Sequence, residues 1–399
     1  MYRLHMTIPE YQDPWLLPFD LRMRSFYEAH SANRKCIVAV YNHPDNSTFR
    51  YRIYNVYQAL KKSSSLCLCY FFEDELHHVI SRLGFASVVV MCRTSWTPLV
   101  QRTIDVAKER KIPVLFDVDD RVFDLECLQL LADSLDISLD DESSRKFWGA
   151  YIALIYMVAN QADGFITTND FLGQRLQNKF GKPFVVIENS LNEEQLIVSS
   201  EVRRQKLNAE QDNYFTLGYF SGSPSHVNDL KVALPEIIEL LHQYEKMKLL
   251  IVGYMDLPNS LKELAAAQKV FLKSFVDFKT LQVLMAQVDL NLVPLFENGF
   301  TNCKSNLKFF EGAVVDVPTC ATPIYSYAHS IQDKKTGFLC RQGQWYQTIS
   351  DIYLGKYDLN ALRNSAREYA LKHYSGEYFL ASIEKAYDSI LHQLSCSSM

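Results

Sequence analysis

Residues 298–323 read NGFTNCKSNLKFFEGAVVDVPTCATP, and this stretch is the part of the sequence that decides the fold. It follows an apolar run at 288–294 that predicts a β-strand, and it ends in a second such run at 318–322. Between them the sequence predicts a loop and then a helix from about 305 to 315. Because both runs consist mainly of apolar and small residues, they are typical of parallel strands whose two faces are covered by helices.

The same strand–helix unit recurs over most of the chain. Further short runs of β-branched and aromatic residues lie at 36–41, 66–72, 87–92, 113–118, 164–168, 184–188, 216–220, 248–253, 270–275 and 337–340. The repeat stops between 189 and 213, where the sequence is polar and charged. This pattern predicts an α/β protein with two doubly wound, Rossmann-like domains, at 1–190 and 213–375, joined by a linker at 191–212. Ligands of such sheets bind beyond the carboxyl ends of the strands, so we expect a central cleft between the domains.

Composition excludes several classes of protein. The 399 residues carry 41 Lys and Arg against 46 Asp and Glu, whereas a protein that coats nucleic acid needs clustered excess cations. Nine scattered cysteines without a C-x-x-C pair favour free thiols in a reducing compartment over disulfides or structural zinc. The most apolar stretch, 147–159, is too short to span a bilayer. With no secretory signal pattern, the chain is predicted to be cytoplasmic, and a peripheral contact with the inner face of the membrane stays open.

Residues that could bind a ligand or take part in catalysis lie in and next to the predicted helix at 305–315. Lys304 and Lys308 lie one turn apart near its start, where the free N–H groups attract an anion. Ser305 can cap the helix or donate to a phosphate oxygen. Glu311, further along, is placed to accept paired hydrogen bonds from a diol such as ribose. The alternative is an amphipathic surface helix with a Lys–Glu pair, and the spacing alone does not decide between the two.

Charged residues also follow two strands of the first predicted domain. Asp117, Asp119 and Asp120 lie at the end of the strand at 113–118. Three such close carboxylates need water, cations or sugar hydroxyls as partners, so we expect them on the acceptor side of the cleft. A structural cap is the alternative for at least one of them. Arg50 and Arg52 open the helix that follows the first strand, at 36–41, where the helix dipole disfavours cations, and we expect them to bind a diphosphate, a phosphate-linked acceptor or a partner.

The segment KSNLKFFEGAVVDVPTCATPIYSYAHSIQDKKTGFLC (304–340) resembles the donor-binding segment of family 4 glycosyltransferases, enzymes of the two-domain GT-B fold. Other segments agree in order and position, namely FRYRIYNVYQAL, IPVLFDVDDRVFD, ADGFITTNDFLGQRL, VVIENSLNEEQL and LGYFSGSPSHVNDL. The tail at 366–379 is similar to that family's closing helices, so a helix at 376–399 is expected to pack back on the N-terminal domain. The resemblance implies transfer of a sugar from a nucleoside-diphosphate sugar, with retention at the anomeric carbon.

By that resemblance, Glu311 matches the second glutamate of the family's E-x7-E motif, which contacts the nucleotide ribose. The first glutamate, which contacts the donor sugar, falls at Cys303 in this chain. The arginine that the family uses for the diphosphate is missing from SGSPSHVNDLK (221–231), and Lys304 with the amides near Ser305 is expected to replace it. The donor-binding residues expected in full are Ser221, Gly222, His226, Phe275, Lys304, Ser305, Asn306, Lys308 and Glu311.

These expectations describe a transferase of polysaccharide biosynthesis with Asp119, Asp120 and Lys304 as catalytic residues and with no metal or other cofactor. Its partners would be the sugar donor and a glycan, glycolipid or glycoprotein acceptor, without nucleic acid; an oligomer or a partner transferase stays open. Because Cys303 replaces a glutamate, the alternative is a transferase-like subunit that binds an acceptor or a partner without catalysis. An oxidoreductase is disfavoured, since no G-x-G-x-x-G follows the first strand.

Overall fold

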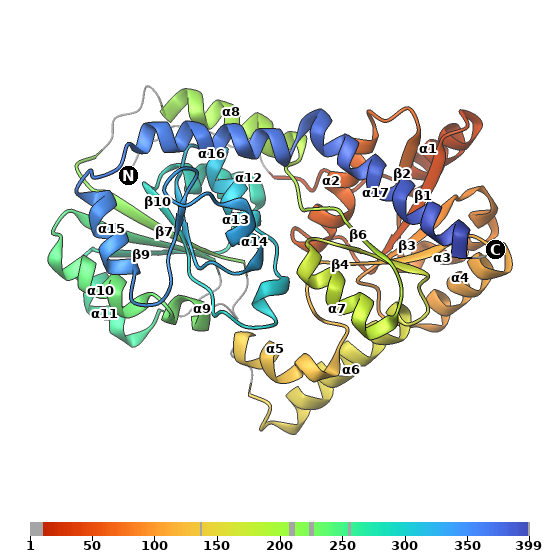
Figure 1. Ribbon diagram of the computed structural model, residues 1–399, viewed down its shortest axis with the longest axis horizontal. Helices are drawn as coiled ribbons and strands as arrows, with labels where there is room; N and C mark the ends of the chain where they lie inside the picture. Colours follow the sequence, from red (N-terminus) through yellow and green to blue (C-terminus); the bar gives the residue numbers. More distant parts are fainter. Residues whose placement is uncertain (1–10, 136–137, 207–211, 223–226, 254–256, 398–399) are drawn as a thin grey trace.

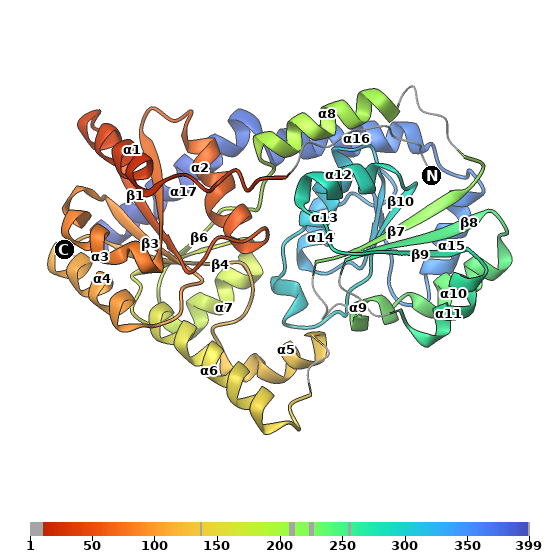
Figure 2. The same cartoon turned by 180° about the vertical axis from the view of Figure 1, so that it is seen from behind.

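The computed structural model describes residues 11–135, 138–206, 212–222, 227–253 and 257–397. Within these ranges the chain forms two lobes, each built on a six-stranded parallel sheet with helices packed against it (Figures 1 and 2). Each apolar run that was predicted as a strand forms one, which confirms the α/β fold class. None of the helices in the described ranges is both long and apolar enough to cross a membrane.

The N-terminal sheet has the strand order β2–β1–β3–β4–β5–β6, all parallel. Its strands are β1 (Lys35–Tyr41), β2 (Leu66–Phe72), β3 (Val88–Cys92), β4 (Val114–Val118), β5 (Gly164–Thr167) and β6 (Phe184–Val186). Along β1, Val38 and Val40 lie in one apolar cluster, whereas Ile37 and Ala39 lie in another. Both faces of the sheet are therefore buried, which is why its strands are apolar without alternation.

Apart from α1, which precedes β1, the helices of this domain connect successive strands. They are α1 (Phe19–Ser31), the π-helical turn η1 (Arg50–Tyr54), α2 (Asn55–Leu60), the 3₁₀ turn η2 (Glu73–Glu75), α3 (Leu76–Val79), the 3₁₀ segment η3 (Ile80–Phe85), α4 (Pro98–Glu109), the 3₁₀ turn η4 (Leu125–Cys127), α5 (Leu128–Leu135), α6 (Glu142–Ala159) and α7 (Asp170–Phe180). Sequence signals explain several of the starts. Asn169 caps α7 through Leu172 N, and α4 has a proline in its first turn behind the capping Thr97.

The second sheet has the strand order β12–β11–β10–β7–β8–β9 and is also parallel. Its strands are β7 (Phe215–Ser221), β8 (Met247–Gly253), β9 (Val270–Lys273), β10 (Leu290–Val293), β11 (Thr319–Ala321) and β12 (Phe338–Leu339). The intervening helices are α9 (Val227–Lys231), α10 (Leu234–Gln243), the 3₁₀ turn η6 (Asn259–Leu261), α11 (Lys262–Ala266), α12 (Phe278–Ala286), the 3₁₀ turn η7 (Thr301–Cys303), α13 (Leu307–Ala313), α14 (Tyr325–Ser330) and α15 (Trp345–Tyr353).

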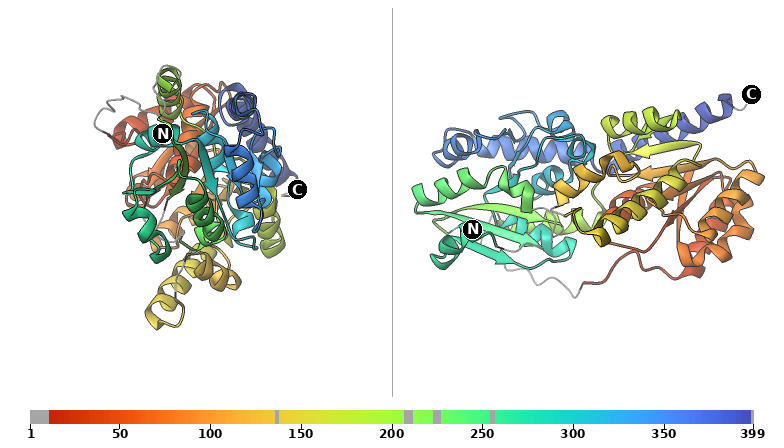
Figure 3. Two further views of the ribbon diagram at one scale, coloured as in Figure 1. Left: turned by 90° about the vertical axis from the view of Figure 1, so that its left-hand side faces the viewer. Right: turned by 90° about the horizontal axis from the view of Figure 1, so that it is seen from below.

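Two helical connections run between the lobes, and Figures 1 and 3 show them along the same side of the molecule. The first is α8 (Glu193–Lys206), which lies within the polar stretch that was interpreted as the linker. The second is formed by α16 (Leu359–His373) and α17 (Gly376–Ser397). Helix α17 contacts α2 and β6 of the N-terminal domain, and its Ile383 and Ile390 are buried in that domain's apolar cluster.

The strand orders locate the ligand-binding edges of both sheets. The order reverses between β1 and β3 in the first sheet and between β7 and β10 in the second. Loops that follow such neighbouring strands diverge to opposite faces and leave a crevice at the carboxyl ends of the strands. The loops at both of these switch points line cavities that contain residues of both domains.

Candidate active site

Two adjoining cavities lie between the domains. The first has a volume of about 500 Å³ and is lined by residues 45–47, 50–51, 220–222, 252–253, 275–276, 278, 281, 285, 307–308 and 311. The second has a volume of about 390 Å³ and is lined by residues 47–48, 51, 93, 119–120, 122, 131, 148, 222, 293, 295, 300, 304–305, 307–308 and 327. Ser47, Tyr51, Gly222, Leu307 and Lys308 belong to both, so the two cavities meet at these residues.

Glu311 lies on α13 and is almost completely buried in the wall of the first cavity. Its Oε1 accepts hydrogen bonds from the hydroxyl of Tyr51 and from Gln195 Nε2, the latter at 3.0 Å. Arg50 Nη2 lies 3.5 Å from the same oxygen. Oε2 accepts no hydrogen bond from any residue in the described ranges. Three side chains from outside the second sheet thus orient the carboxylate and leave one oxygen for a ligand.

Arg50 extends from the N-terminal domain into the first cavity, although it is only 4% exposed. Its guanidinium lies over the rings of Tyr51, at 4.0 Å, and Phe278, at 4.7 Å. Its Nε donates to the carbonyl oxygen of Asn46 at 2.8 Å, but its Nη1 is buried and has no hydrogen-bond partner among the described residues. Because an unsatisfied buried donor costs free energy, this atom is suited to an acceptor on a ligand.

Lys308 lies where the two cavities meet. Desolvation lowers the pKa of its ammonium group to about 8, and the like charge of Lys304 contributes, whereas Asp229 and Glu311 oppose the shift. Gly222, after β7, lies at the same junction, and a Cβ added there would meet no atom of the described residues within 4 Å. The space in front of Gly222 is therefore open to a ligand. A cation opposite an open backbone is a suitable arrangement for phosphate.

The second cavity contains the carboxylates expected on the acceptor side. Asp119 is held by Thr48 Oγ1 at 2.9 Å and by Arg93 Nη1 at 3.2 Å. Among the described residues, the Asp120 side chain has only longer ionic contacts, at 3.9 Å, with Arg93 Nη1 and Lys304 Nζ. Burial raises the pKa of Asp120, although Lys304 opposes the shift. Asp120 is therefore the carboxylate with more acceptor capacity left for a substrate hydroxyl.

The roles expected for Arg52 and Asp117 have to be corrected. Arg52 Nε and Nη2 donate to the two carboxylate oxygens of Asp117 at 2.8 and 3.0 Å, and both side chains are buried. Arg52 Nη1 also donates to the Ile187 carbonyl oxygen and to Asn189 Oδ1. Neither residue lines either cavity. Because the pair is internally satisfied, it supports the sheet edge beneath the cleft and is not available to a phosphate or an acceptor.

The helix that carries Glu311 is shorter than predicted, and this changes two further expectations. It begins at Leu307 and ends at Ala313, so Ser305 precedes it and does not cap it. Ser305 lines the second cavity and accepts from Asn189 Nδ2 at 2.9 Å. Asn306 is buried, donates to the Tyr374 hydroxyl at 2.7 Å and lines neither cavity, so its expected donor contact is wrong.

Cys303, at the position of the family's first glutamate, is fully buried and lines neither cavity. Its thiol contacts the Gly299 carbonyl oxygen at 3.4 Å, and burial raises its pKa to about 12. The cysteine is therefore a core residue and not a sugar contact. Asn169 Nδ2 donates to the carbonyl oxygens of Cys303 and Lys304, at 3.0 and 3.2 Å, which ties this loop to the N-terminal domain.

The remaining expected residues fall into two groups. Ser221 and Phe275 line the first cavity, as the donor-site expectation requires, whereas His226 lies outside the described residues. Three further residues line the second cavity or contact its carboxylates and were not predicted from the sequence: Arg93, Tyr51 and Trp148. Arg93 directly follows β3 at the switch point of the first sheet, so the strand-end rule could have found it. No local signal marks the other two.

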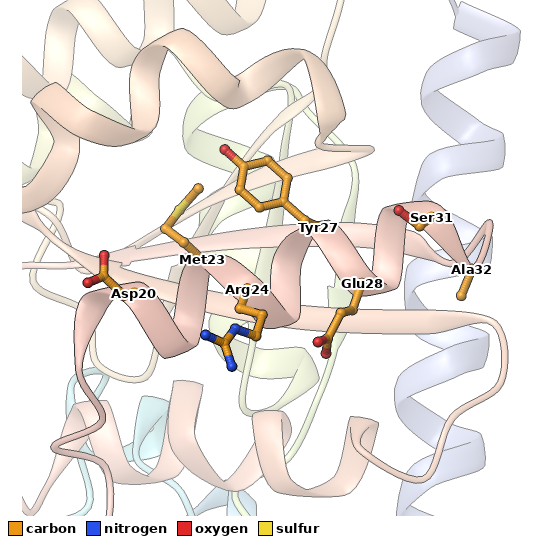
Figure 4. A pocket seen from close by; sticks show the side chains of 7 residues that line it. All are labelled: Asp20, Met23, Arg24, Tyr27, Glu28, Ser31 and Ala32. Atoms are coloured by element: carbon orange, nitrogen blue, oxygen red, sulfur yellow. The ribbon is translucent and has the colours of Figure 1, made fainter.

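A separate hollow of about 700 Å³ lies against α1. Figure 4 shows the side chains that line it, Asp20, Met23, Arg24, Tyr27, Glu28, Ser31 and Ala32. All of them come from α1 and its C-cap residue Ala32, so no groups from different elements converge there. The interdomain cavities are therefore the candidate active site. Within the described residues no three His, Cys, Asp or Glu side chains gather in a way that could hold a metal ion.

Comparisons with known proteins bear on the fold and on the second domain. Residues 215–353 match the family model "Glycosyl transferases group 1". No curated protein sequence matches the chain. Solved structures that share the fold include HepE of Anabaena in complex with UDP (13% identity, TM-score 0.58, 89% of this chain and 100% of that one) and a glycosyltransferase of Rickettsia africae (15%, 0.59, 90% and 99%). A third is the sucrose-phosphate synthase of Thermosynechococcus elongatus (14%, 0.57, 90% and 100%).

These likenesses confirm the GT-B fold that the sequence resemblance implied, with two Rossmann-like domains and a cleft between them. The family match lies on the second domain, from the start of β7 to the end of α15, and includes Glu311 and Lys308. Residues 215–353 therefore resemble the group 1 glycosyltransferases, and the chain as a whole has the GT-B fold.

Proposed function

We propose that the protein transfers a sugar from a nucleoside-diphosphate sugar to a carbohydrate acceptor, as in the assembly of a glycan, glycolipid or glycoprotein, with retention at the anomeric carbon. The observation that carries the proposal is the junction at Gly222 and Lys308 between two cavities of different character. One cavity contains a carboxylate suited to a ribose, and the other contains carboxylates suited to sugar hydroxyls. A donor whose diphosphate lies at the junction would span both. UDP bound to HepE, a protein of the same fold, is consistent with such a donor.

The residues of the two cavities would each contact a different part of the donor. Glu311 would accept from the ribose hydroxyls through Oε2, and the half-exposed Phe275 would face the base. Arg50 would donate to the nucleotide from the N-terminal domain through its unpartnered Nη1. Lys308 would hold the diphosphate, with Lys304 on the sugar side. The nucleotide would then be enclosed by both domains.

Catalysis would depend on positive charge at the leaving group. When the bond between the anomeric carbon and the phosphate oxygen breaks, Lys304 and Lys308 would stabilise the negative charge that develops on the diphosphate, which is usually the largest catalytic contribution. These two cations would make a bound metal ion unnecessary. The departing phosphate would take the proton of the acceptor hydroxyl on the same face of the sugar, so the new bond would retain the configuration. Asp120 would orient that hydroxyl.

A second candidate is a subunit of the same fold that binds ligands without catalysis. The observation in its favour is Cys303, which stands at the position of the family's first glutamate and is buried away from both cavities. Transfer of a sugar by the purified chain alone would exclude this candidate.

The first test is thermal stability of the purified chain in the presence of UDP, GDP, dTDP, CMP or NAD. A ligand present at 100 times its Kd adds about 2.7 kcal/mol, which raises the midpoint by roughly 5 to 10 °C for a domain of this size. We expect one nucleoside diphosphate to produce this shift, and EDTA to leave it unchanged. If NAD stabilises the protein and none of the nucleoside diphosphates does, the proposed donor site is wrong.

The pKa of Lys308 predicts a pH dependence of donor binding. Its ammonium is protonated below about pH 8, and a bound diphosphate would raise this pKa, so affinity is present below pH 8 and decreases above it. We expect the Kd for the nucleoside diphosphate to rise roughly tenfold or more between pH 7.5 and 9.5. A ratio of this size corresponds to the loss of one charge-assisted hydrogen bond. Lys308→Met should remove this dependence, as measured by calorimetric titration. A wild-type Kd that stays constant over this range would contradict the role of Lys308.

A further inference from the structure

The second cavity is completed by a helical excursion between β4 and β5, formed by α5 and α6. Figures 1 and 2 show the two helices projecting from the N-terminal domain toward the other lobe. Helix α5 contacts α9 of the second domain, and Asn228 Nδ2 donates across the gap to the Asp133 carbonyl oxygen at 3.0 Å. Leu131 of α5 packs with Ile152 of α6 and with Phe300 of the second domain. The excursion is therefore a wall of the cleft shared by both domains.

Three aromatic side chains follow one another along α6, and we call them the aromatic row: Phe147, Trp148 and Tyr151. Their ring centroids are 5.5 and 5.7 Å apart, and both pairs are edge-to-face. Phe147 is 64% exposed, Trp148 is half-buried and lines the second cavity, and the Tyr151 hydroxyl accepts from Arg93 Nε at 3.1 Å. The row therefore leads from solvent into the cavity that contains Asp119 and Asp120.

We propose that the aromatic row binds an oligosaccharide acceptor of at least two sugar units, with the terminal unit against Trp148 and the preceding one against Phe147. This inference rests on the proposed function, because it names the acceptor of the same site. The C–H face of a sugar ring packs well on an aromatic face, while the hydroxyls around its rim need polar partners. The second cavity offers both, since Trp148 stands in the same cavity as Asp120, whose carboxylate has acceptor capacity left.

The charge around the row favours a neutral glycan over a membrane. The end of α5 and the start of α6 carry Asp133, Asp140, Asp141 and Glu142, against the two cations Arg145 and Lys146. Lys146 is moreover paired with Glu142 at 2.7 Å. An anionic lipid surface attracts basic segments and would repel this one. An exposed Phe147 beside a net negative charge is therefore better suited to an uncharged sugar.

The experiment measures binding of cello-, chito- and manno-oligosaccharides of one to four units to the full chain, in the presence of saturating UDP. We expect at least one series to bind, with affinity increasing from one unit to two. Trp148→Ala should weaken binding about tenfold, and Trp148→Phe should restore most of the loss. Phe147→Ala should abolish the gain from the second unit. Met157→Ala, an exposed apolar side chain on the same helix, is the matched control and should bind as the wild type does.

Two readouts separate this inference from the proposed function. Thermal stabilisation by the nucleoside diphosphate should be equal in wild type, Trp148→Ala and Phe147→Ala, because none of these residues lines the first cavity. If the nucleotide binds but no oligosaccharide series does, or if Trp148→Ala binds glycans as well as the wild type, the acceptor inference is wrong and the proposed function stands. Binding to phosphatidylglycerol vesicles that is lost in Phe147→Ala would also overturn it and would assign the row to a membrane. Loss of nucleotide binding in the wild type would instead contradict the proposed function.

Discussion

Glu311→Gln is expected to weaken binding of the nucleoside diphosphate about a hundredfold while the protein remains folded. In the wild type, Oε1 is occupied by Tyr51 and Gln195, and Oε2 is left to accept from a ribose. The amide keeps the size of the side chain but replaces one acceptor oxygen with a donor. Hydrogen bonds to charged groups contribute about 1.5–3 kcal/mol each, so the loss of one or two of them corresponds to about a hundredfold in Kd.

The measurement is calorimetric titration with the nucleotide that stabilises the wild type, and Glu297→Gln is the matched control. Glu297 lies in the same domain, is exposed and pairs with Arg341 at the surface, so its replacement should leave the Kd unchanged. Tyr51→Phe keeps the carboxylate but removes one of the groups that orient it, and it should produce a smaller loss. If Glu311→Gln binds the nucleotide with wild-type affinity, Glu311 does not contact the ribose.

Arg52→Met is expected to destabilise the N-terminal domain by about 3–5 kcal/mol, because it leaves a buried carboxylate without its partner. Burial already raises the pKa of Asp117 to about 6 against the opposing effect of Arg52, which shows how strongly this site disfavours an unpaired charge. The same substitution also leaves the Ile187 carbonyl oxygen and Asn189 without their donor. The thermal midpoint should fall by roughly 6 to 20 °C for a domain of this size.

Lys35→Met is the control for this variant. Lys35 forms an ion pair of similar length with Asp388 at 2.8 Å, but the side chains are 52% and 61% exposed, and such pairs contribute at most about 1 kcal/mol. The double variant Arg52→Met/Asp117→Asn should recover part of the loss, because the unpaired charge is gone. If the thermal midpoint of Arg52→Met lies within about a degree or two of that of the control, the structural role is wrong and Arg52 is again a candidate for ligand binding.

Features that depend on local sequence periodicity were predictable. Parallel strands buried on both faces are apolar throughout, so the strands, the α/β class and the edge at which ligands bind followed from the sequence. The donor segment was recognisable for a similar reason, since Lys308 and Glu311 are separated by about one helical turn and share a face. Asp119 and Asp120 were found because they follow a strand directly.

The predictions about single side chains that failed did so for one physical reason. The partners of a side chain come from distant parts of the chain. Asn306 was expected at the donor but is bound by Tyr374, and Cys303 is enclosed by the core. Trp148 belongs to the apolar stretch at 147–159, and nothing in that stretch marks it as a residue that lines a cavity. Its position in the cavity depends on how α6 projects from the domain and on what the second lobe places opposite it.

Arg50 and Arg52 show which features could not be predicted from the sequence alone. By itself the sequence determined that two arginines open the segment after the first strand, next to the cleft. Their roles differ because positions two apart on a helical turn point in different directions, and here the turn is the π-helical η1. Arg50 faces the nucleotide-sized cavity with an unpartnered Nη1, whereas Arg52 faces Asp117 inside the domain. Only the tertiary structure decided that Arg52 is fully satisfied by Asp117 and its neighbours, whereas Arg50 contacts Glu311 and keeps one unsatisfied donor beside a cavity, because these surroundings are supplied by segments far away in the chain.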